Sequence, residues 1–219
     1  MTHAQAPAIL PALCWRSFLR ESVLFSASTI LFHASRLGVH LFAASRLDPA
    51  VFGLWNALSL ILLYGSIVTL GLIPAMNREL PLWQGRGDRS QAVRVRSVCW
   101  GWTVCSSLGA GLLLLAVSVL ATLPPTTRTV LWWLGPLFVA DQLYAYFQAY
   151  LKSDQRFGLM SRQQFLFAAL LPVVAGPLIL VHGLAGYMAG QAVGMLMLCV
   201  YIARKTGFRG YVKLDRHEI

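Results

Sequence analysis

Long apolar stretches alternate with short polar or basic segments along almost the whole chain. A helix rises 1.5 Å per residue, so about 20 apolar residues are needed to cross the ~30 Å hydrocarbon core of a bilayer. Six stretches reach about that length, at residues 21–45, 51–77, 97–123, 130–151, 164–182 and 186–203. The pattern therefore predicts an all-α integral membrane protein with a bundle of six transmembrane helices over residues 21–203. The polar segments 1–20 and 204–219 flank this bundle.

Lysine and arginine fall almost entirely on one side of the predicted spans. Fifteen of them lie in the terminal segments or in the longer connections 78–96 and 152–163, whereas Arg46 and Arg128 lie on the other side. Such residues accumulate on the cytoplasmic side of membrane proteins. Segments 1–20 and 204–219 are therefore both predicted to be cytoplasmic.

The composition supports a membrane protein and changes how the charge is interpreted. The chain is 57% hydrophobic and 12% charged, with a mean hydropathy of +0.63, which differs from ordinary soluble domains. A net charge of +10 would suggest nucleic acid as the partner of a soluble protein. Here most of the charge belongs to cytoplasmic loops that meet anionic headgroups, so membrane lipids are the expected partners and nucleic acid is not.

The first span carries an unusual stripe of ionisable side chains, formed by His33, Arg36 and His40. At 100° per residue these positions fall within one sector of a helix. An arginine near mid-span costs about 2.5–3.5 kcal/mol of insertion free energy, so Arg36 is expected to face protein or a water-filled cavity. A cationic cavity attracts phosphate or pyrophosphate, and we predict that the three residues bind such a substrate. The alternative for the histidines is ordinary packing as polar residues.

Asp141, in the fourth span, is the obvious counter-charge for Arg36. An ion pair between them would lock two helices together, or would couple proton binding to a conformational change by opening and closing. Asp141 also begins a polar face that continues through Tyr144, Gln148 and Lys152 at helical spacing. We therefore assign Asp141 and Gln148 to coupling or ion pairing, with hydrogen bonding between helices as the alternative.

Sequence signatures of covalent chemistry are missing. The chain has no GxxxxGK[ST], HExxH or GxSxG motif, and its four cysteines form no CxxC pair. The sequence therefore predicts a protein that is not an enzyme and that carries no cofactor or metal.

The segment Arg46–Gln84, RLDPAVFGLWNALSLILLYGSIVTLGLIPAMNRELPLWQ, resembles the polysaccharide-transport branch (O-antigen and capsule repeat-unit flippases) of the multidrug/oligosaccharidyl-lipid/polysaccharide exporter superfamily. Those proteins commonly have an "LG-P-x-x-FG-x-W" connection, then a helix running to "LGL…A…R-x-x-P" and a basic "G-x-G-D" loop. The matching residues are Leu47, Pro49, Phe52, Gly53, Trp55, Leu70, Gly71, Leu72, Ala75, Arg78, Glu79, Pro81, Gly85, Gly87 and Asp88. Residues 147–157 and 182–190 resemble later connections of that family.

The resemblance implies a transporter in the bacterial inner membrane that flips an undecaprenyl-pyrophosphate-linked glycan for cell-surface polysaccharide synthesis. Family members usually have two six-helix bundles, and this chain supplies one. A homodimer or a second six-helix partner is therefore expected. The alternative is a non-transporting membrane scaffold, or a truncated remnant, associated with a polysaccharide-assembly complex. Export of a cationic drug, by contrast, calls for an acidic cavity.

Overall fold

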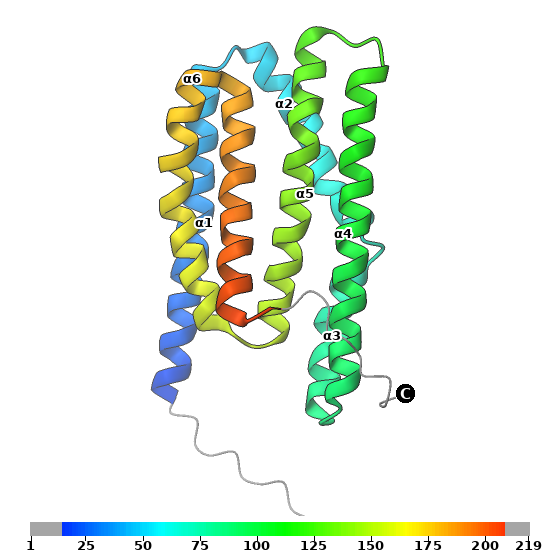
Figure 1. Cartoon of the computed structure of the whole chain (residues 1–219). Helices are drawn as coiled ribbons and strands as arrows, with labels where there is room; N and C mark the ends of the chain where they lie inside the picture. Colours follow the sequence, from blue (N-terminus) through cyan, green and yellow to red (C-terminus); the bar gives the residue numbers. More distant parts are fainter. Residues whose placement is uncertain (1–14, 209–219) are drawn as a thin grey trace, which may run out of the picture.

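The computed structural model describes residues 15–208, and every regular element in that range is helical (Figure 1). The elements are α1 (Trp15–Arg46), α2 (Pro49–Leu63), the 3₁₀ helix η1 (Tyr64–Ile67), α3 (Leu72–Gly85), α4 (Arg89–Leu120), α5 (Pro125–Ser153) and α6 (Phe157–Thr206). The predicted all-α class is confirmed. Residues 1–14 and 209–219, and with them most of the two predicted cytoplasmic segments, lie outside the described residues.

Helix α6 is a hairpin of two antiparallel limbs, because the chain folds back at Gly183 (φ 59°, ψ −128°). A positive φ of this kind is readily adopted only by glycine. The limbs approach closely: a Cβ added to Gly190 would lie 2.7 Å from Cα of Ala175. With α1, α4, α5 and a broken second rod, the two limbs make six antiparallel rods. The predicted connection at residues 183–185 is thus confirmed as a bend at its first residue.

The second rod differs from the continuous helix predicted over residues 51–77. It breaks after α2 into η1 and a turn, in which Leu70 (φ 49°) and Gly71 (φ 76°) have left-handed backbone conformations, before α3 begins. Pro74 lies in the first turn of α3, where a missing N–H removes no helical hydrogen bond. The hydropathy of this stretch is uninterrupted, so it gives no indication of the break.

The predicted basic loop 78–96 is also mostly helical, because α3 continues to Gly85 and α4 begins at Arg89. The Asp88 carboxylate caps α4 by accepting a hydrogen bond from the backbone N–H of Gln91 at 3.0 Å. This bond, with a second one from the Ser90 hydroxyl, lowers the pKa of Asp88. The connection between the two helices therefore shrinks to residues 86–88.

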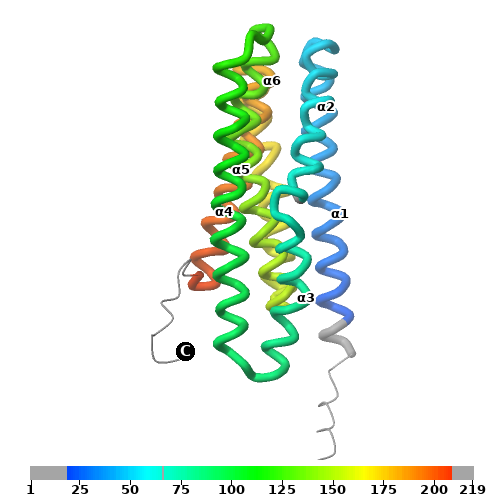
Figure 2. Tube along the Cα trace, turned by 90° about the vertical axis from the view of Figure 1, so that its right-hand side faces the viewer, coloured from blue at the N-terminus to red at the C-terminus, as the bar shows by residue number. Residues whose placement is uncertain are grey.

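Both described ends of the chain lie at the same end of the bundle (Figure 1). The α3–α4 and α5–α6 connections lie there too, whereas the α1–α2 and α4–α5 connections and the α6 bend lie at the opposite end. The second rod runs obliquely, from beside α1 to the foot of α4, as both views show (Figures 1 and 2). The basic connections of the sequence thus meet at one end of the bundle, which we call the basic end.

Helix α5 is at the centre of the packing, with most of its side chains buried. It approaches α4 through glycines: a Cβ on Gly135 would lie 2.9 Å from the carbonyl oxygen of Gly111. Helix α1 is tied to α6 by Ser28, whose hydroxyl donates to Gln164 at 2.6 Å. Small residues at helix contacts and hydrogen bonds between helices are typical of membrane bundles.

Two helices, α4 and α6, are long and apolar enough to cross a membrane by length and composition. Their most apolar windows are only 22% and 28% buried within the bundle. The prediction of six transmembrane spans goes beyond this finding and stays a prediction.

Candidate functional site

A cavity of about 840 Å³ lies between α1, the second rod, α5 and the second limb of α6. We call it the central cavity. Its lining combines polar side chains with aromatic and aliphatic ones: Arg36, His40, Trp55, Ser59, Leu62, Leu63, Ile67, Thr69, Gly71, Ile73, Pro74, Leu137, Asp141, Gln142, Ala145, Tyr187, Gln191 and Met195. The volume falls within the range of about 300–1,000 Å³ that is usual for small-molecule sites.

Two residues of the predicted stripe reach this cavity. Arg36 lines it with a largely exposed side chain, and its guanidinium carbon lies 5.8 Å from the centre of the Phe32 ring. His40 is half-buried, and its Nδ1 lies 3.0 Å from the Tyr187 hydroxyl of α6. The structure thus places the Arg36 guanidinium and a hydrogen-bonded imidazole along one wall.

His33 does not line the central cavity, contrary to the predicted three-residue stripe. Its side chain is exposed, and its ring packs edge-on against Phe32 at 5.3 Å between centres. Rotation around the helix does not explain the difference, because seven residues make almost two full turns and His33 and His40 point within about 20° of each other. The two residues differ in their position along the axis: at 1.5 Å per residue, His33 lies about 10 Å from His40, beside the Phe32 ring and not at the central cavity.

Asp141 lines the same cavity as Arg36, but the two do not form an ion pair. Among residues 15–208 the ion pair within 4.0 Å joins Arg156 and Asp154 instead. The Asp141 carboxylate accepts a long hydrogen bond, 3.4 Å, from the side-chain amide of its neighbour Gln142. Within the described residues, Arg36 therefore has no carboxylate within 4.0 Å, and its side chain lines the cavity.

Gln148 does not line the cavity. Of the predicted polar face, Asp141 lines the cavity, whereas Tyr144 and Gln148 do not. Tyr144 accepts a hydrogen bond from Nε2 of the fully buried Gln163 at 3.3 Å. Within residues 15–208, Nε2 of Gln148 and Oε1 of Gln163 are buried without a hydrogen-bond partner. Tyr144 and Gln163 thus show the alternative of hydrogen bonding between helices, whereas the coupling role of Gln148 stays a prediction.

Several lining residues were not singled out from the sequence. Gln142 follows Asp141 directly, and Tyr187, Gln191 and Met195 repeat every four residues along one face of the second α6 limb. The sequence could have indicated this face of α6, because Tyr187 and Gln191 are polar residues four positions apart in an otherwise apolar stretch. Thr69 and Gly71, in the irregular turn, also line the cavity. The only sequence feature that could have indicated this turn was the glycine.

The chain was compared with protein-family models, with curated proteins and with solved structures. None of these comparisons finds a match. Within residues 15–208, no three His, Cys, Asp or Glu side chains gather as metal ligands would. The interpretation of the site therefore depends on its own geometry and chemistry.

Proposed function

We propose that all six rods cross the bacterial inner membrane and that the bundle transports a lipid-linked oligosaccharide, as one half of an assembled flippase. Membrane insertion is supported by what covers the outside of the bundle. Each of the six α-helices has exposed large apolar side chains, and several are strongly exposed, such as Ile30 (71%), Leu120 (82%) and Val181 (74%). Exposed apolar surface on this scale is unfavourable in water and is stabilised by lipid.

Three rods, α1, α5 and the second rod, do not meet the criteria of length and composition that α4 and α6 meet, and their positions suggest why. Helix α1 carries Arg36 and His40, and α5 carries Asp141 and Gln142, all of which line the central cavity. Polar side chains in a membrane bundle face the interior or a watery cavity. The second rod is interrupted where it lines that cavity, which is where a bilayer tolerates irregular backbone.

The observation that carries the transport proposal is Arg36, which lines the central cavity and has no carboxylate within 4.0 Å among residues 15–208. Guanidinium is always charged and binds phosphate oxygens in pairs, which suits a pyrophosphate. His40, Tyr187, Gln142 and Gln191 add hydrogen-bonding groups for sugar hydroxyls. Arg36 is also largely exposed, so a second bundle, from another copy or another chain, would supply the missing wall.

The test is flipping of a fluorescent polyprenyl-pyrophosphate oligosaccharide in liposomes that contain the purified protein. Wild-type protein should accelerate flipping over empty liposomes, and Arg36→Gln should slow it at least about tenfold, as expected for loss of charge-assisted hydrogen bonds. Arg46→Gln is the matched control, because Arg46 lies on the same helix but outside the cavity. It should change the rate less than about twofold.

A wild-type rate equal to that of empty liposomes, with the protein correctly inserted and assembled, would contradict transport. A scaffold that holds other assembly proteins would then be the better account.

A further inference from the structure

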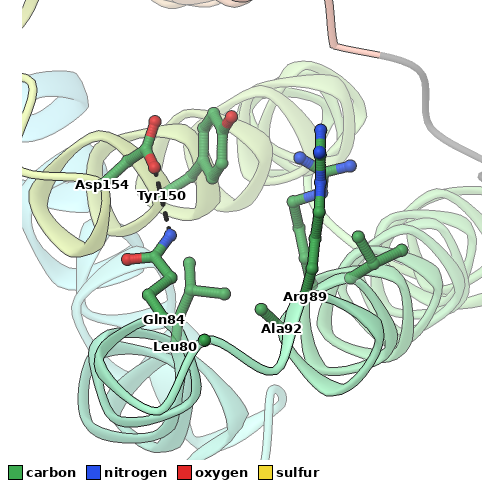
Figure 3. Close-up of a pocket in the computed structure, with 9 residues that line it drawn as sticks. Leu80, Gln84, Arg89, Ala92, Tyr150 and Asp154 are labelled. Atoms are coloured by element: carbon green, nitrogen blue, oxygen red, sulfur yellow. Dashed lines mark hydrogen bonds between the residues drawn. The ribbon is translucent and has the colours of Figure 1, made fainter.

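A second pocket lies at the basic end, far from the central cavity along the bundle. It has a volume of about 310 Å³ and is formed by α3, α4 and α5 (Figure 3). Leu80 and Ala92 form an apolar wall, and Tyr150 is buried beside them. We call it the α3–α4–α5 pocket, and the rest of its lining is Gln84, Gly87, Arg89, Val93, Arg96 and Asp154.

The two arginines reach this pocket from one face of α4, because seven residues make almost two full turns. Arg96 is held in place by aromatic rings: its guanidinium carbon lies 5.8 Å from the centre of Tyr150 and 5.7 Å from that of Phe208. Such cation–π contacts orient the guanidinium without neutralising it. Neither arginine has a carboxylate within 4.0 Å in the described part of the chain.

Asp154 is the one acidic residue in the lining, and its carboxylate is already engaged. One oxygen accepts a hydrogen bond from the Gln84 amide at 3.2 Å (Figure 3). The other oxygen forms the ion pair with Arg156, which does not line the pocket. The two guanidiniums therefore leave the pocket with an excess of positive charge.

We propose that the α3–α4–α5 pocket binds a phosphate group, and that an anionic phospholipid headgroup supplies it. Two guanidiniums present paired N–H donors, which match phosphate oxygens. At about 30 Å³ per water molecule, 310 Å³ has room for a phosphate with part of its hydration. If the bundle crosses the membrane as proposed above, the basic end lies at the cytoplasmic headgroups, where basic pockets between helices bind anionic lipids. The lipid as the source rests on that proposal, whereas phosphate binding does not.

Binding is measured by native mass spectrometry of the full chain in neutral detergent, titrated with phosphatidylglycerol or with phosphatidylcholine. One phosphatidylglycerol should bind at least about tenfold more tightly than phosphatidylcholine. The double variant Arg89→Gln/Arg96→Gln should lose this preference. The control Arg78→Gln/Arg94→Gln removes the same charge from exposed positions outside the pocket and should keep the affinity within about twofold.

Gln84→Glu is a second test that leaves the buried wall intact, since Gln84 is exposed. It places a negative charge at the rim and should weaken phosphatidylglycerol binding at least about tenfold. Inorganic phosphate, titrated alone and as a competitor, separates the two sources. Binding of inorganic phosphate that depends on Arg89 and Arg96, with no preference between the lipids, would support phosphate chemistry but overturn the lipid as its source.

Equal affinity for both lipids without phosphate binding, or equal loss in the control and pocket variants, would overturn the proposal. Because this measurement needs no flipping, it is independent of the transport assay, and Arg36→Gln should leave it unchanged.

Discussion

Helix α5 and the second rod cross each other, yet α5 stays continuous and the second rod breaks. Helix α5 contains Pro136 and Asp141 and remains one helix over 29 residues, with neighbours on most of its faces. The second rod has no proline at its break, yet it unwinds between Leu63 and Leu72. The two rods touch where a Cβ on Gly65 would lie 2.6 Å from the Gln142 amide nitrogen.

The difference shows that surroundings, more than local sequence, decide where these rods stay regular. A proline in a surrounded helix leaves a carbonyl that neighbours can satisfy, and tight packing holds the backbone in register. The second rod borders the central cavity, where polar backbone groups can be hydrated. The irregular turn is therefore tolerated beside the central cavity, where a ligand would bind.

The largest expected effect comes from α5. Replacing Gly135 by Ala places a Cβ 2.9 Å from the backbone carbonyl oxygen of Gly111, which cannot rotate away. Helices α4 and α5 must separate, and we expect the protein to lose about 1–3 kcal/mol of unfolding free energy. Denaturant titration in detergent micelles measures it.

Gly109→Ala is the control, because an added Cβ there meets no atom within 4 Å. It should be neutral or slightly stabilising, as expected for alanine in a helix. Equal destabilisation by both substitutions would show that α4 and α5 do not pack through these glycines.

A smaller effect is expected in the second rod. Gly71→Ala forces alanine into a left-handed conformation (φ 76°), which costs about 1–2 kcal/mol. Gly53→Ala, within α2 and free of nearby atoms, should instead stabilise the protein by up to about 1 kcal/mol. The same titration measures both, and a stabilising Gly71→Ala would mean that the rod is an ordinary continuous helix.

The smallest effect concerns Arg36 and Asp141, whose charged atoms are farther apart than 4.0 Å. Because both residues line the central cavity without forming an ion pair, Arg36→Gln and Asp141→Asn should be nearly additive, with a coupling below about 1 kcal/mol in a double-mutant cycle. A coupling of several kcal/mol would instead indicate a buried ion pair, and with it the locked-helix alternative that the sequence left open.

The sequence was a good guide to the rods and a poor one to their ends and interruptions. The all-helical class is confirmed, and every predicted stretch except 51–77 corresponds to one rod or one limb of α6. Hydropathy finds apolar length, but it cannot distinguish a loop from a polar helical turn, so residues 78–85 and 89–96 were assigned to a connection. Hydropathy also could not reveal the break near Leu70, because the residues there are as apolar as those in the helices on either side.

The candidate site was predictable only where a polar side chain is conspicuous in an apolar helix. Arg36 and Asp141 stood out for that reason, and both line the central cavity. His33 was included because helical spacing gives the direction of a side chain around the helix but not how far along the axis the cavity extends. Tyr187 was missed because a tyrosine among apolar residues resembles an ordinary packed side chain until its contact with His40 is seen.

The account's central claim is that the bundle crosses a membrane with its basic end in the cytoplasm. Single cysteines at Arg128 and at Arg89, in a background without native cysteines, test it by labelling with an impermeant maleimide added to intact cells. The account predicts labelling at position 128, at the end opposite the basic connections, and at position 89 only after the cells are broken. Labelling at position 89 in intact cells, or at neither position in the membrane fraction, would contradict it.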